Sequence, residues 1–433
     1  MKKLSWFLLV LVLSVFMVAC SDSDTETGTE DDSSKTEGNS TGTESDEGSS
    51  LSGEITVWAH PFTDGTTGEA EMFEKIIANF ESETGVKVNF EQIPWANRDQ
   101  KILTALAAGQ GPDVFYVIPD QMPQYAEQGL IAPITEYFTE EDLSAFVPSA
   151  FEATTWKDEL YGIPVLQTAE SFFYNVDVIN AIGEDPTKLP TTWDEFKVWA
   201  EKAKAAGYYA FSYPGGGSLN NTLYPFLWQA GGNVIDEDNN ILINNEAGVK
   251  TFTFIKEMYD NGWIPADSIS SIDQSATYLS GKILALNGSG VSITTITNEA
   301  DFDFVIGEPL TETEKATYGT VGMFVTSAIS KNMDGAAAFI KHFTNAENQR
   351  EFNTVTQYIP TVEEAKDIYD SQPKLAQLAG YTDYAKPGVI NPNGRTIMPL
   401  VQAEIQAMLE GKQTPQEAAD KSAAAIENML QTQ

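Results

Sequence analysis

In the body of the chain, short apolar strands alternate with segments of helical periodicity, and this alternation limits the possible folds more than any other feature. Strands are predicted at 54–58, 86–90 and 113–117. The segments between these strands carry apolar residues at helical spacing, and Gly85 and Gly109 end them. This β-α-β-α-β order is typical of an open, mainly parallel sheet with helices on both faces, and it excludes a β-sandwich.

The same alternation begins again in the second part of the chain. Strands are predicted at 208–212, 283–287 and 302–306, and Thr192 opens a helix before the first of them, with Glu195 completing a capping box. Two sheets predict an α/β fold with two doubly wound lobes. Because ligands bind beyond the carboxyl ends of strands in open α/β sheets, the cleft between the lobes is the expected site.

Aromatic, acidic and amide side chains follow the predicted strands directly, and we expect them to line the cleft. These residues are His60, Phe62, Trp95, Asp120, Glu170, Tyr213, Asn287 and Gly288. Trp228, in the segment PFLWQAGG, adjoins a loop signal and is a further candidate for stacking on a ligand, as Trp95 is.

The charge and the cysteine and histidine counts exclude several classes of function. The chain has 25 Lys and Arg against 63 Asp and Glu, a formal net charge of −38. So acidic a protein repels phosphate backbones, and we expect no nucleic-acid partner. One Cys and two His exclude a disulfide framework, a cysteine zinc site and a histidine-rich metal centre. We therefore expect no metal and no cofactor.

The sequence carries no motif of a known catalytic site. The G-x-S-x-G elbow, the P-loop and the H-E-x-x-H helix do not occur in it, so we expect no catalytic residue. Asp236, Asp238 and Asn240 have the spacing of a calcium loop, but Ile241 stands where Gly is needed, which favours a polar hairpin turn. A secreted carbohydrate-active hydrolase or lyase needs only two carboxylates and stays open as the alternative function.

The amino-terminal segment has the form of an export signal. Two lysines precede an apolar run that ends at Ala19 and is short for a membrane span. The residues MVAC at 17–20 resemble a bacterial lipobox, with Met17 where Leu is usual. We therefore predict a signal peptide over 1–19 and a lipid on Cys20 that anchors the protein to the cell membrane, outside the cytoplasm. An ordinary signal peptide and a short membrane anchor are the alternatives.

The segment that follows the cysteine is strongly acidic and almost without apolar side chains. Residues 21–50 contain ten acidic residues and one lysine. Such a segment cannot bury enough surface to offset the entropy of ordering it. The interval 20–52 is therefore predicted to be a lipid-anchored, disordered tether, which would hold the body about 30 Å from the anchor.

Ten segments occur in an order that resembles a known family. They are ITVWAH, FESETGVKVNFEQIPW, KILTALAAGQGPDVFYV, YGIPV, FYNVDVINAIG, LPTTWDEFKVWAEKAK, LWQAGG, LSGKILALNGSG, YGTVGMFVTSAISKN and AAFIKHFTNAENQREF. From about Gly53 to the C-terminus, the chain resembles the family 1 extracellular solute-binding proteins of the maltose-binding type, which serve ABC importers.

The resemblance implies a periplasmic-binding-protein-like fold of class II with its ligand cleft between two lobes. It implies an N-terminal lobe of 53–168 plus 325–358 and a C-terminal lobe of 170–320 plus 361–433. It further implies a carbohydrate ligand, permease subunits of an ABC transporter as partners, and a monomer that closes over its ligand. To the candidate site residues it adds Asn97, Tyr116, Met323, Phe324 and Arg395.

Two departures from the maltose binders bear on the ligand. Ser289 and Gly290 stand in a loop where those proteins carry an aromatic residue, and Met398 replaces a second aromatic residue in the late helix. Both departures count against maltodextrin and leave a neutral oligosaccharide as the expected ligand. Glycerol phosphate or another small solute remains an alternative ligand for the same fold.

Overall fold

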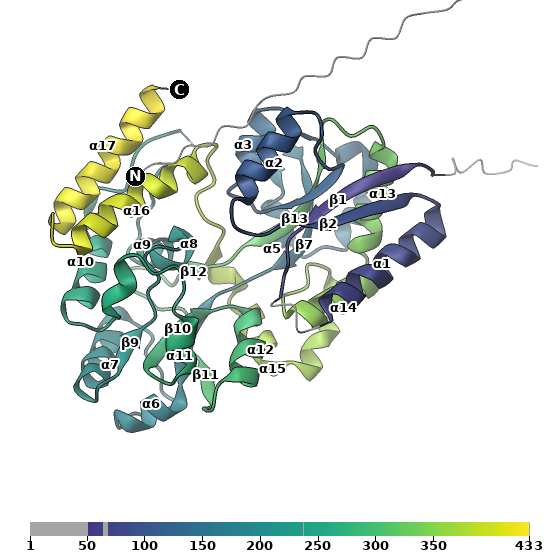
Figure 1. The fold of residues 1–433 in the computed structure, drawn as a ribbon. Coiled ribbons are helices and arrows are strands. Elements are labelled where there is room, and N and C mark those ends of the chain that lie inside the picture. Colours follow the sequence, from purple (N-terminus) through teal and green to yellow (C-terminus); the bar gives the residue numbers. More distant parts are fainter. Residues whose placement is uncertain (1–50, 64–67, 237, 433) are drawn as a thin grey trace, which may run out of the picture. The chain divides into compact units, whose positions relative to one another are not determined.

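The structure is a computed structural model that describes residues 51–63, 68–236 and 238–432. The predicted signal peptide, the lipobox with Cys20 and residues 21–50 of the predicted tether lie outside the described residues. Within the described part of the chain, no helix is both long enough and apolar enough to cross a membrane. Helices surround two main β-sheets, each the centre of one lobe (Figure 1).

The first lobe contains a sheet of six strands in the order β2-β1-β3-β13-β4, with β7 paired to β13. The strands are β1 (Glu54–Ala59), β2 (Lys87–Gln92), β3 (Val114–Val117), β4 (Ile131–Ala132), β7 (Gly162–Gln167) and β13 (Val321–Ser327). β1 is parallel to both β2 and β3, as the β-α-β-α-β pattern predicts.

Alternate residues of the first sheet face two helical layers (Figure 1). Val57 and Val114 belong to the core formed with α1, α13 and α14, whereas Trp58 and Phe115 belong to the core formed with α2 and α3. This is the period-two burial of a sheet that is covered on both faces. The helices are α1 (Glu69–Thr84), α2 (Arg98–Ala107), α3 (Met122–Glu127), α13 (Met333–Phe343) and α14 (Ala346–Thr356).

The second lobe contains a sheet of four strands in the order β11-β8-β10-β9. The strands are β8 (Ser171–Asn175), β9 (Tyr209–Phe211), β10 (Ile283–Gly288) and β11 (Phe304–Ile306). One face packs with α7 (Trp193–Ala205), α9 (Tyr224–Gln229), α10 (Glu246–Asp260), α16 (Gly394–Leu409) and α17 (Pro415–Gln431). The other face packs with α11 (Ser275–Leu279), α12 (Gly290–Glu299) and α15 (Pro373–Ala379).

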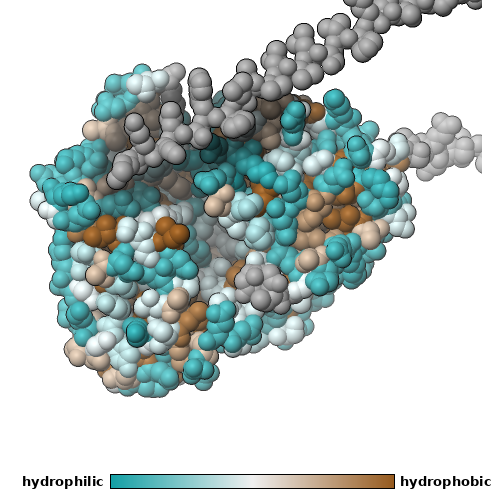
Figure 2. Space-filling model, in the orientation of Figure 1, coloured by the Kyte–Doolittle hydropathy of each residue, from teal (hydrophilic) through white to brown (hydrophobic). Residues whose placement is uncertain are grey.

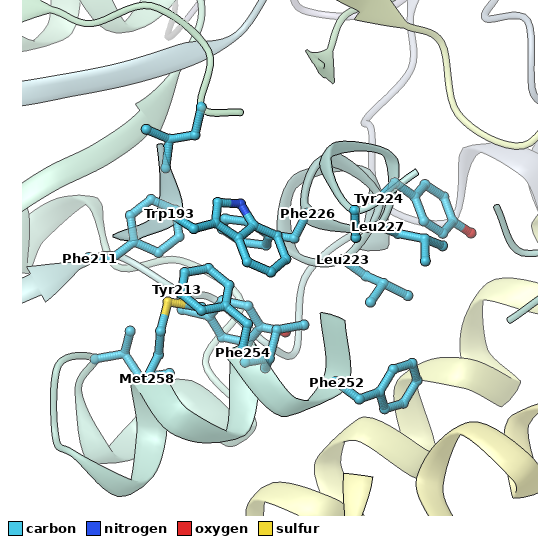
Figure 3. Packing of buried hydrophobic residues seen from close by; sticks show 14 of the residues in the cluster. Trp193, Phe211, Tyr213, Leu223, Tyr224, Phe226, Leu227, Phe252, Phe254 and Met258 are labelled. Atoms are coloured by element: carbon cyan, nitrogen blue, oxygen red, sulfur yellow. The ribbon is translucent and has the colours of Figure 1, made fainter. Parts of the chain in front are cut away.

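The core of the second lobe is rich in aromatic rings. Trp193, the first residue of α7, lies flat against Phe254 of α10, with 4.2 Å between the ring centroids (Figure 3). Its indole N–H donates to Gln229 Oε1 over 2.6 Å, so the polar edge of the buried ring is satisfied. Thr192 caps this helix, as predicted, and its hydroxyl accepts from the backbone N–H of Glu195. The predicted capping box is not formed, because the Glu195 carboxylate accepts from the backbone N–H of Thr191 instead.

Short elements complete the fold. They are α4 (Glu140–Ser144), α5 (Pro148–Glu152), β5 (Thr155–Trp156), β6 (Glu159–Leu160), α6 (Val176–Ala181), α8 (Leu219–Thr222), β12 (Thr317–Tyr318), β14 (Ala385–Lys386) and 3₁₀ helices at Thr135–Tyr137, Ala266–Ile269, Glu363–Ser371 and Thr382–Tyr384. In the predicted polar hairpin, Ile235 pairs with Ile241, and the Asp236 carboxylate accepts from the backbone N–H of Asn240.

Both sheets are mainly parallel, as predicted, but each contains one strand that runs in the opposite direction. β13 runs antiparallel to β3, and β8 runs antiparallel to both β10 and β11. β7 carries the chain out of the first lobe, β8 continues into the second lobe, and β13 brings the chain back. β8 and β13 each enter their sheet from the cleft, whereas their neighbouring strands end at the cleft. Each of these two strands therefore runs opposite to its neighbours.

Extended segments connect the lobes and bond to one another through their backbones. The N–H of Gln167 donates to the carbonyl of Ile359 over 2.8 Å, and the N–H of Ile359 donates back over 3.0 Å. Thr168 N–H donates to Thr320 O, and Glu170 N–H donates to Tyr318 O, each over 2.8 Å. We call these three bonded segments, 167–170, 318–321 and 358–361, the hinge.

The lobe boundaries that the sequence suggested stay a prediction. The strands of the first sheet lie within 54–167 and 321–327, and those of the second sheet lie within 171–306. The later 3₁₀ helix at Glu363–Ser371 contributes Ala365 to the core of the first lobe and Ile368 to that of the second.

The close backbone approach in the hinge requires glycine at position 319. A Cβ on Gly319 would lie 2.3 Å from the carbonyl oxygen of Thr168, which cannot move without breaking the pairing. We expect Gly319→Ala to lower the free energy of unfolding by about 1–3 kcal/mol in urea titrations. Gly380→Ala is the control, because its nearest neighbour would be 3.3 Å away. Equal stability of Gly319→Ala and the wild type would contradict the steric argument.

Candidate ligand-binding cleft

Strands of both lobes bring aromatic and polar side chains to one cavity between them, with a volume of about 270 Å³. It is lined by Trp95, Arg98, Tyr116, Ile118, Leu166, Thr168, Glu170, Ser218, Asn220, Asn221, Ser289, Tyr318, Thr320, Tyr358 and Arg395. The face seen in Figure 2 is mainly hydrophilic and is hollowed near its middle. The cavity is thus where an open α/β fold places its ligands, beyond the carboxyl ends of strands.

Trp95, in the loop after β2, is the most exposed aromatic residue of the cavity, with 37% of its surface exposed. Its indole N–H donates to the carbonyl of Pro61 over 2.6 Å, which fixes the ring. The His60 ring lies 4.2 Å away, and the guanidinium carbon of Arg98 lies 4.8 Å from the ring centroid. Trp95 therefore presents a fixed apolar surface beside a cationic group.

His60 is held in one protonation state. Its Nδ1 lies 2.8 Å from the carbonyl oxygen of Ile93, which can only accept a hydrogen bond, so Nδ1 carries the proton. Burial lowers the pKa of His60 to about 4, so the ring is neutral at neutral pH. Its Nε2 is consequently an acceptor, and it has no hydrogen-bond partner among the described residues.

An ion-pair cluster crosses the cleft. Arg395, in α16 of the second lobe, donates to Asp99 Oδ2 over 3.0 Å and to Asp120 Oδ2 over 3.1 Å, and both aspartates belong to the first lobe. Gln121 donates to the other oxygen of Asp99. We call Arg395, Asp99 and Asp120 the Arg395 cluster.

The pKa values of the two carboxyl groups of the Arg395 cluster shift in opposite directions. Burial raises the pKa of Asp120, against the opposing charge of Arg395. Burial acts in the same direction on Asp99, but Arg395 and Arg98 together outweigh it and hold the pKa of Asp99 below its usual value. The pairing with arginine offsets the cost of one fully buried and one partly buried carboxylate in this cleft.

Glu170 is a buried carboxyl group at the edge of the hinge. The Asn221 side-chain amide donates to both of its oxygens over 2.8 Å, and the Asn287 amide donates to Oε2. Burial nevertheless raises the pKa of Glu170 to about 8, because no cation compensates its charge among the groups that shift it. The side chain is therefore mostly protonated at neutral pH and can donate as well as accept a hydrogen bond.

Several polar atoms in and beside the cavity lack partners, although buried polar atoms normally have them. Within the described chain, Arg98 Nε, Asp120 Oδ1 and Asn220 Oδ1 are buried without a hydrogen bond. One of these atoms is a donor and two are acceptors. Together with His60 Nε2, they form a mixed set that a ligand with hydroxyl groups can satisfy.

A comparison with protein families decides to which group the chain belongs. Residues 64–350, more than half of the chain, match the model of the family described as bacterial extracellular solute-binding protein. The chain belongs to this family. By that description, solute-binding proteins of this kind act outside the cytoplasm, and they bind their solutes rather than convert them.

Three curated relatives of this solute-binding protein illustrate the range of ligands. The galactooligosaccharide-binding protein of Bacillus subtilis is 23% identical over 99% of this chain and 97% of its own length. The maltotriose-binding protein of Pyrococcus abyssi is 26% identical over 72% of this chain and 67% of its own length. A sn-glycerol-3-phosphate-binding periplasmic protein of Escherichia coli is 25% identical over 75% and 81%.

Solved structures confirm the predicted class of fold. An ABC substrate-binding protein of Listeria monocytogenes, in complex with cycloalternan, superposes on this solute-binding protein with a TM-score of 0.78 and 22% identity. The match covers 88% of this chain and 99% of that chain. The predicted α/β fold with two lobes, of the class II periplasmic-binding-protein type, is therefore confirmed.

The structure brings part of the predicted site together. Trp95, Tyr116, Glu170 and Arg395 line the cavity. Four more predicted residues contact this lining: His60 and Phe62 pack against Trp95 and Tyr116, Asp120 binds Arg395, and Asn287 binds Glu170. Phe324 of β13 lies behind Tyr116, with 6.4 Å between the ring centroids.

The remaining five predicted residues are also outside the lining of the cavity. Tyr213 and Trp228 are buried in the aromatic core of the second lobe, and Met323 is buried under α2 and α3. Asn97 is exposed and precedes α2, and Gly288 ends β10 with its Cα facing Ser292 and Phe173. Contact of these five residues with a ligand stays a prediction.

Sequence reasoning missed the polar start of α8. Ser218, Asn220 and Asn221 enter the cavity directly after the glycine run 215–217. The run is needed because a Cβ on Gly215 would lie 2.3 Å from a backbone oxygen. In the sequence, the available signal was a run of glycines that follows a predicted strand and precedes the polar segment SLNN. Tyr318 and Tyr358 were also missed, since only the pairing of the hinge segments brings them to the cavity.

The buried Glu170 makes stability depend on pH. Between the ordinary pKa of 4.5 and the folded value of about 8, the folded protein keeps a proton that the unfolded chain releases. The free energy of unfolding therefore falls as pH rises through this window. In Glu170→Gln this titration is removed, so we expect the variant to gain on the order of 1–3 kcal/mol relative to the wild type between about pH 5 and pH 8.

Urea unfolding at several pH values measures this difference. Glu159→Gln is the control, because Glu159 is exposed and its removal should leave the pH dependence unchanged. A Glu170→Gln variant whose stability runs parallel to that of the wild type across the window would show that Glu170 keeps its ordinary pKa.

Proposed function

We propose that this protein is the substrate-binding component of an ABC importer and that it captures a neutral carbohydrate by closing its two lobes. The observation that carries the proposal is the composition of the cleft cavity. Four aromatic rings, Trp95, Tyr116, Tyr318 and Tyr358, line it together with amides, hydroxyls and charged groups. A sugar offers apolar C–H faces for stacking on rings and hydroxyl groups that both donate and accept, so it needs both kinds of neighbour.

The charges around the cavity favour a ligand without net charge. Arg395 is bonded to Asp99 and Asp120, and Arg98 lies 3.9 Å from Asp99, so two guanidinium groups face two carboxylates. Glu170 adds little charge at neutral pH because its pKa is about 8. An anion such as glycerol phosphate would leave one negative charge uncompensated in a buried site, which is costly.

Lobe closure follows from the way in which the cavity is shared. Trp95, Arg98 and Tyr116 come from the first lobe, whereas Ser218, Asn221 and Ser289 come from the second. A ligand that contacts both sets binds the closed arrangement more tightly than an open one, and this difference in affinity drives closure about the hinge. The closed complex is then what the permease subunits receive.

A ligand screen tests the carbohydrate proposal directly. The body from residue 53 is mixed with neutral mono- and oligosaccharides, and its melting temperature is measured, because a ligand bound only by the folded state raises it. We expect a shift with at least one sugar, recovery of that sugar unaltered after incubation, and no shift with glycerol phosphate. A chemically altered sugar would instead support the hydrolase or lyase alternative.

Trp95 provides a sharper test once a sugar has been found. We expect Trp95→Ala to weaken binding by about ten-fold or more, because loss of a stacking ring costs on the order of 1–2 kcal/mol. Trp156→Ala is the matched control, since Trp156 bonds Glu127 on the surface of the first lobe, away from the cavity. Equal affinities of the two variants, measured by calorimetry, would rule out stacking on Trp95.

We further propose that Cys20 carries a lipid that holds the protein on the outer face of the cell membrane. The support is the lipobox-like MVAC at 17–20 and the acidic segment that follows it. We expect Cys20→Ser, expressed in a bacterium, to move the protein from the membrane fraction to the soluble extracytoplasmic fraction. Retention of the variant in the membrane would favour an uncleaved apolar anchor.

A further inference from the structure

The cleft cavity is small for a receptor of long sugars. Its volume of about 270 Å³ lies just below the range of roughly 300–1,000 Å³ that holds drug-sized ligands. The exposed residues in its lining are Trp95 from the first lobe and Ser218 from the second. We take the opening of the cavity to lie between these two side chains, because the other lining residues are partly or fully buried.

The floor of the cavity separates it from a second, larger space. Side chains of extended segments alternate between two faces. In and directly before the hinge, Leu166, Glu170 and Tyr318 face the cleft cavity, whereas Gln167, Gly319 and Val321 line a cavity of about 480 Å³ on the other face. Among the described residues, only Thr168 and Thr320 line both cavities. A ligand in the cleft cannot extend through the paired hinge segments into the second cavity.

The Arg395 cluster closes the cavity on the side of α2. The side chain of Asp120 is fully buried, and that of Arg395 is 19% exposed. Because Arg395 belongs to the second lobe and its two partners belong to the first, the cluster crosses the cleft and forms one boundary of the cavity. Removing one partner of a buried ion pair leaves an uncompensated charge, so a ligand that displaced Arg395 would have to offset this cost.

A second bonded group closes another side of the cavity. Glu170 receives three hydrogen bonds, two from Asn221 at α8 and one from Asn287 in β10. These side chains come from the hinge and from two elements of the second lobe. We take this bonded group as a second boundary of the space that is open to a sugar chain.

We infer that this site binds one or two sugar rings, as a free sugar or as the end of a longer chain, and that Arg395 sets this limit on ligand length. The inference rests on the proposed function and makes it more specific. Rings beyond the second lie outside the mouth between Trp95 and Ser218 and contribute little. Arg395 is a specificity-determining residue in this scheme, because its ion pairs form this boundary of the cavity.

A length series tests the limit. Calorimetry of the body from residue 53 with gluco- and galacto-configured sugars of one to five rings gives the dissociation constant for each length. We expect a mono- or disaccharide to bind, and each ring beyond the second to change the constant by less than about three-fold. Affinity that rises about ten-fold or more from two rings to four, or binding by long sugars alone, would overturn the limit and leave the proposed function standing.

Binding by no sugar of either series would overturn the proposed function, and the limit on length with it. The two failures are therefore distinguishable in one experiment.

Arg395→Ala tests whether the Arg395 cluster limits the length of the ligand. We expect Arg395→Ala to raise the ratio of tetrasaccharide affinity to disaccharide affinity about five-fold or more above the ratio of the wild type. Asp99→Asn removes one partner of the cluster and should move the same ratio in the same direction, which covers the case that Arg395→Ala does not fold. Arg350→Ala is the matched control, because Arg350 pairs with Asp367 on the surface.

The measured quantity is the ratio of the two affinities and not the affinity itself, so a general loss of binding does not count as support. Melting curves show which variants are folded. An unchanged ratio in the folded variants of Arg395 and Asp99 would overturn the role of Arg395.

Discussion

The backbone hydrogen bonds of the hinge are the interaction on which the rest of the structure depends. Each lobe has its own sheet and its own apolar cores. The bonds between Gln167 and Ile359 and between Thr168 and Thr320 fix the lobes to one another. They also place Glu170, Tyr318 and Tyr358 along the floor of the cavity. The same backbone hydrogen bonds therefore join the lobes and position residues of the site.

The cleft shows two ways of burying an acidic group. Asp99 and Asp120 share the guanidinium of Arg395, and this pairing offsets the cost of taking them out of water. Glu170 has amide partners only, and its pKa rises instead. The first solution ties the lobes together by charge, whereas the second leaves a proton that a ligand hydroxyl can accept as a hydrogen bond.

The sequence was a good guide to what local periodicity decides. The strands that contain Val57 and Val114 and the helix capped by Thr192 are where their patterns place them. The direction of β13 was not predictable in this way, because it depends on a crossing from the other lobe more than a hundred residues after β7.

The same distinction holds for the site. Trp95 and Glu170 lie next to strand ends and were found from that position. Tyr318, Tyr358 and the Asn220 amide reach the cavity through long-range pairing and through a glycine run, which periodicity does not reveal. Trp228 resembled an exposed loop residue in sequence but is buried, since α9 lies inside the second lobe.

The two titrating groups at the cleft define an operating range. His60 gains a proton only near pH 4, and Glu170 loses its proton only near pH 8. Between these limits neither group changes its main protonation state, so the hydrogen bonds that these two side chains offer stay the same. A cell does not control the acidity of the medium outside its membrane. Burial alone therefore lets a receptor exposed there keep these two ligand-binding groups in the same protonation states over about three pH units.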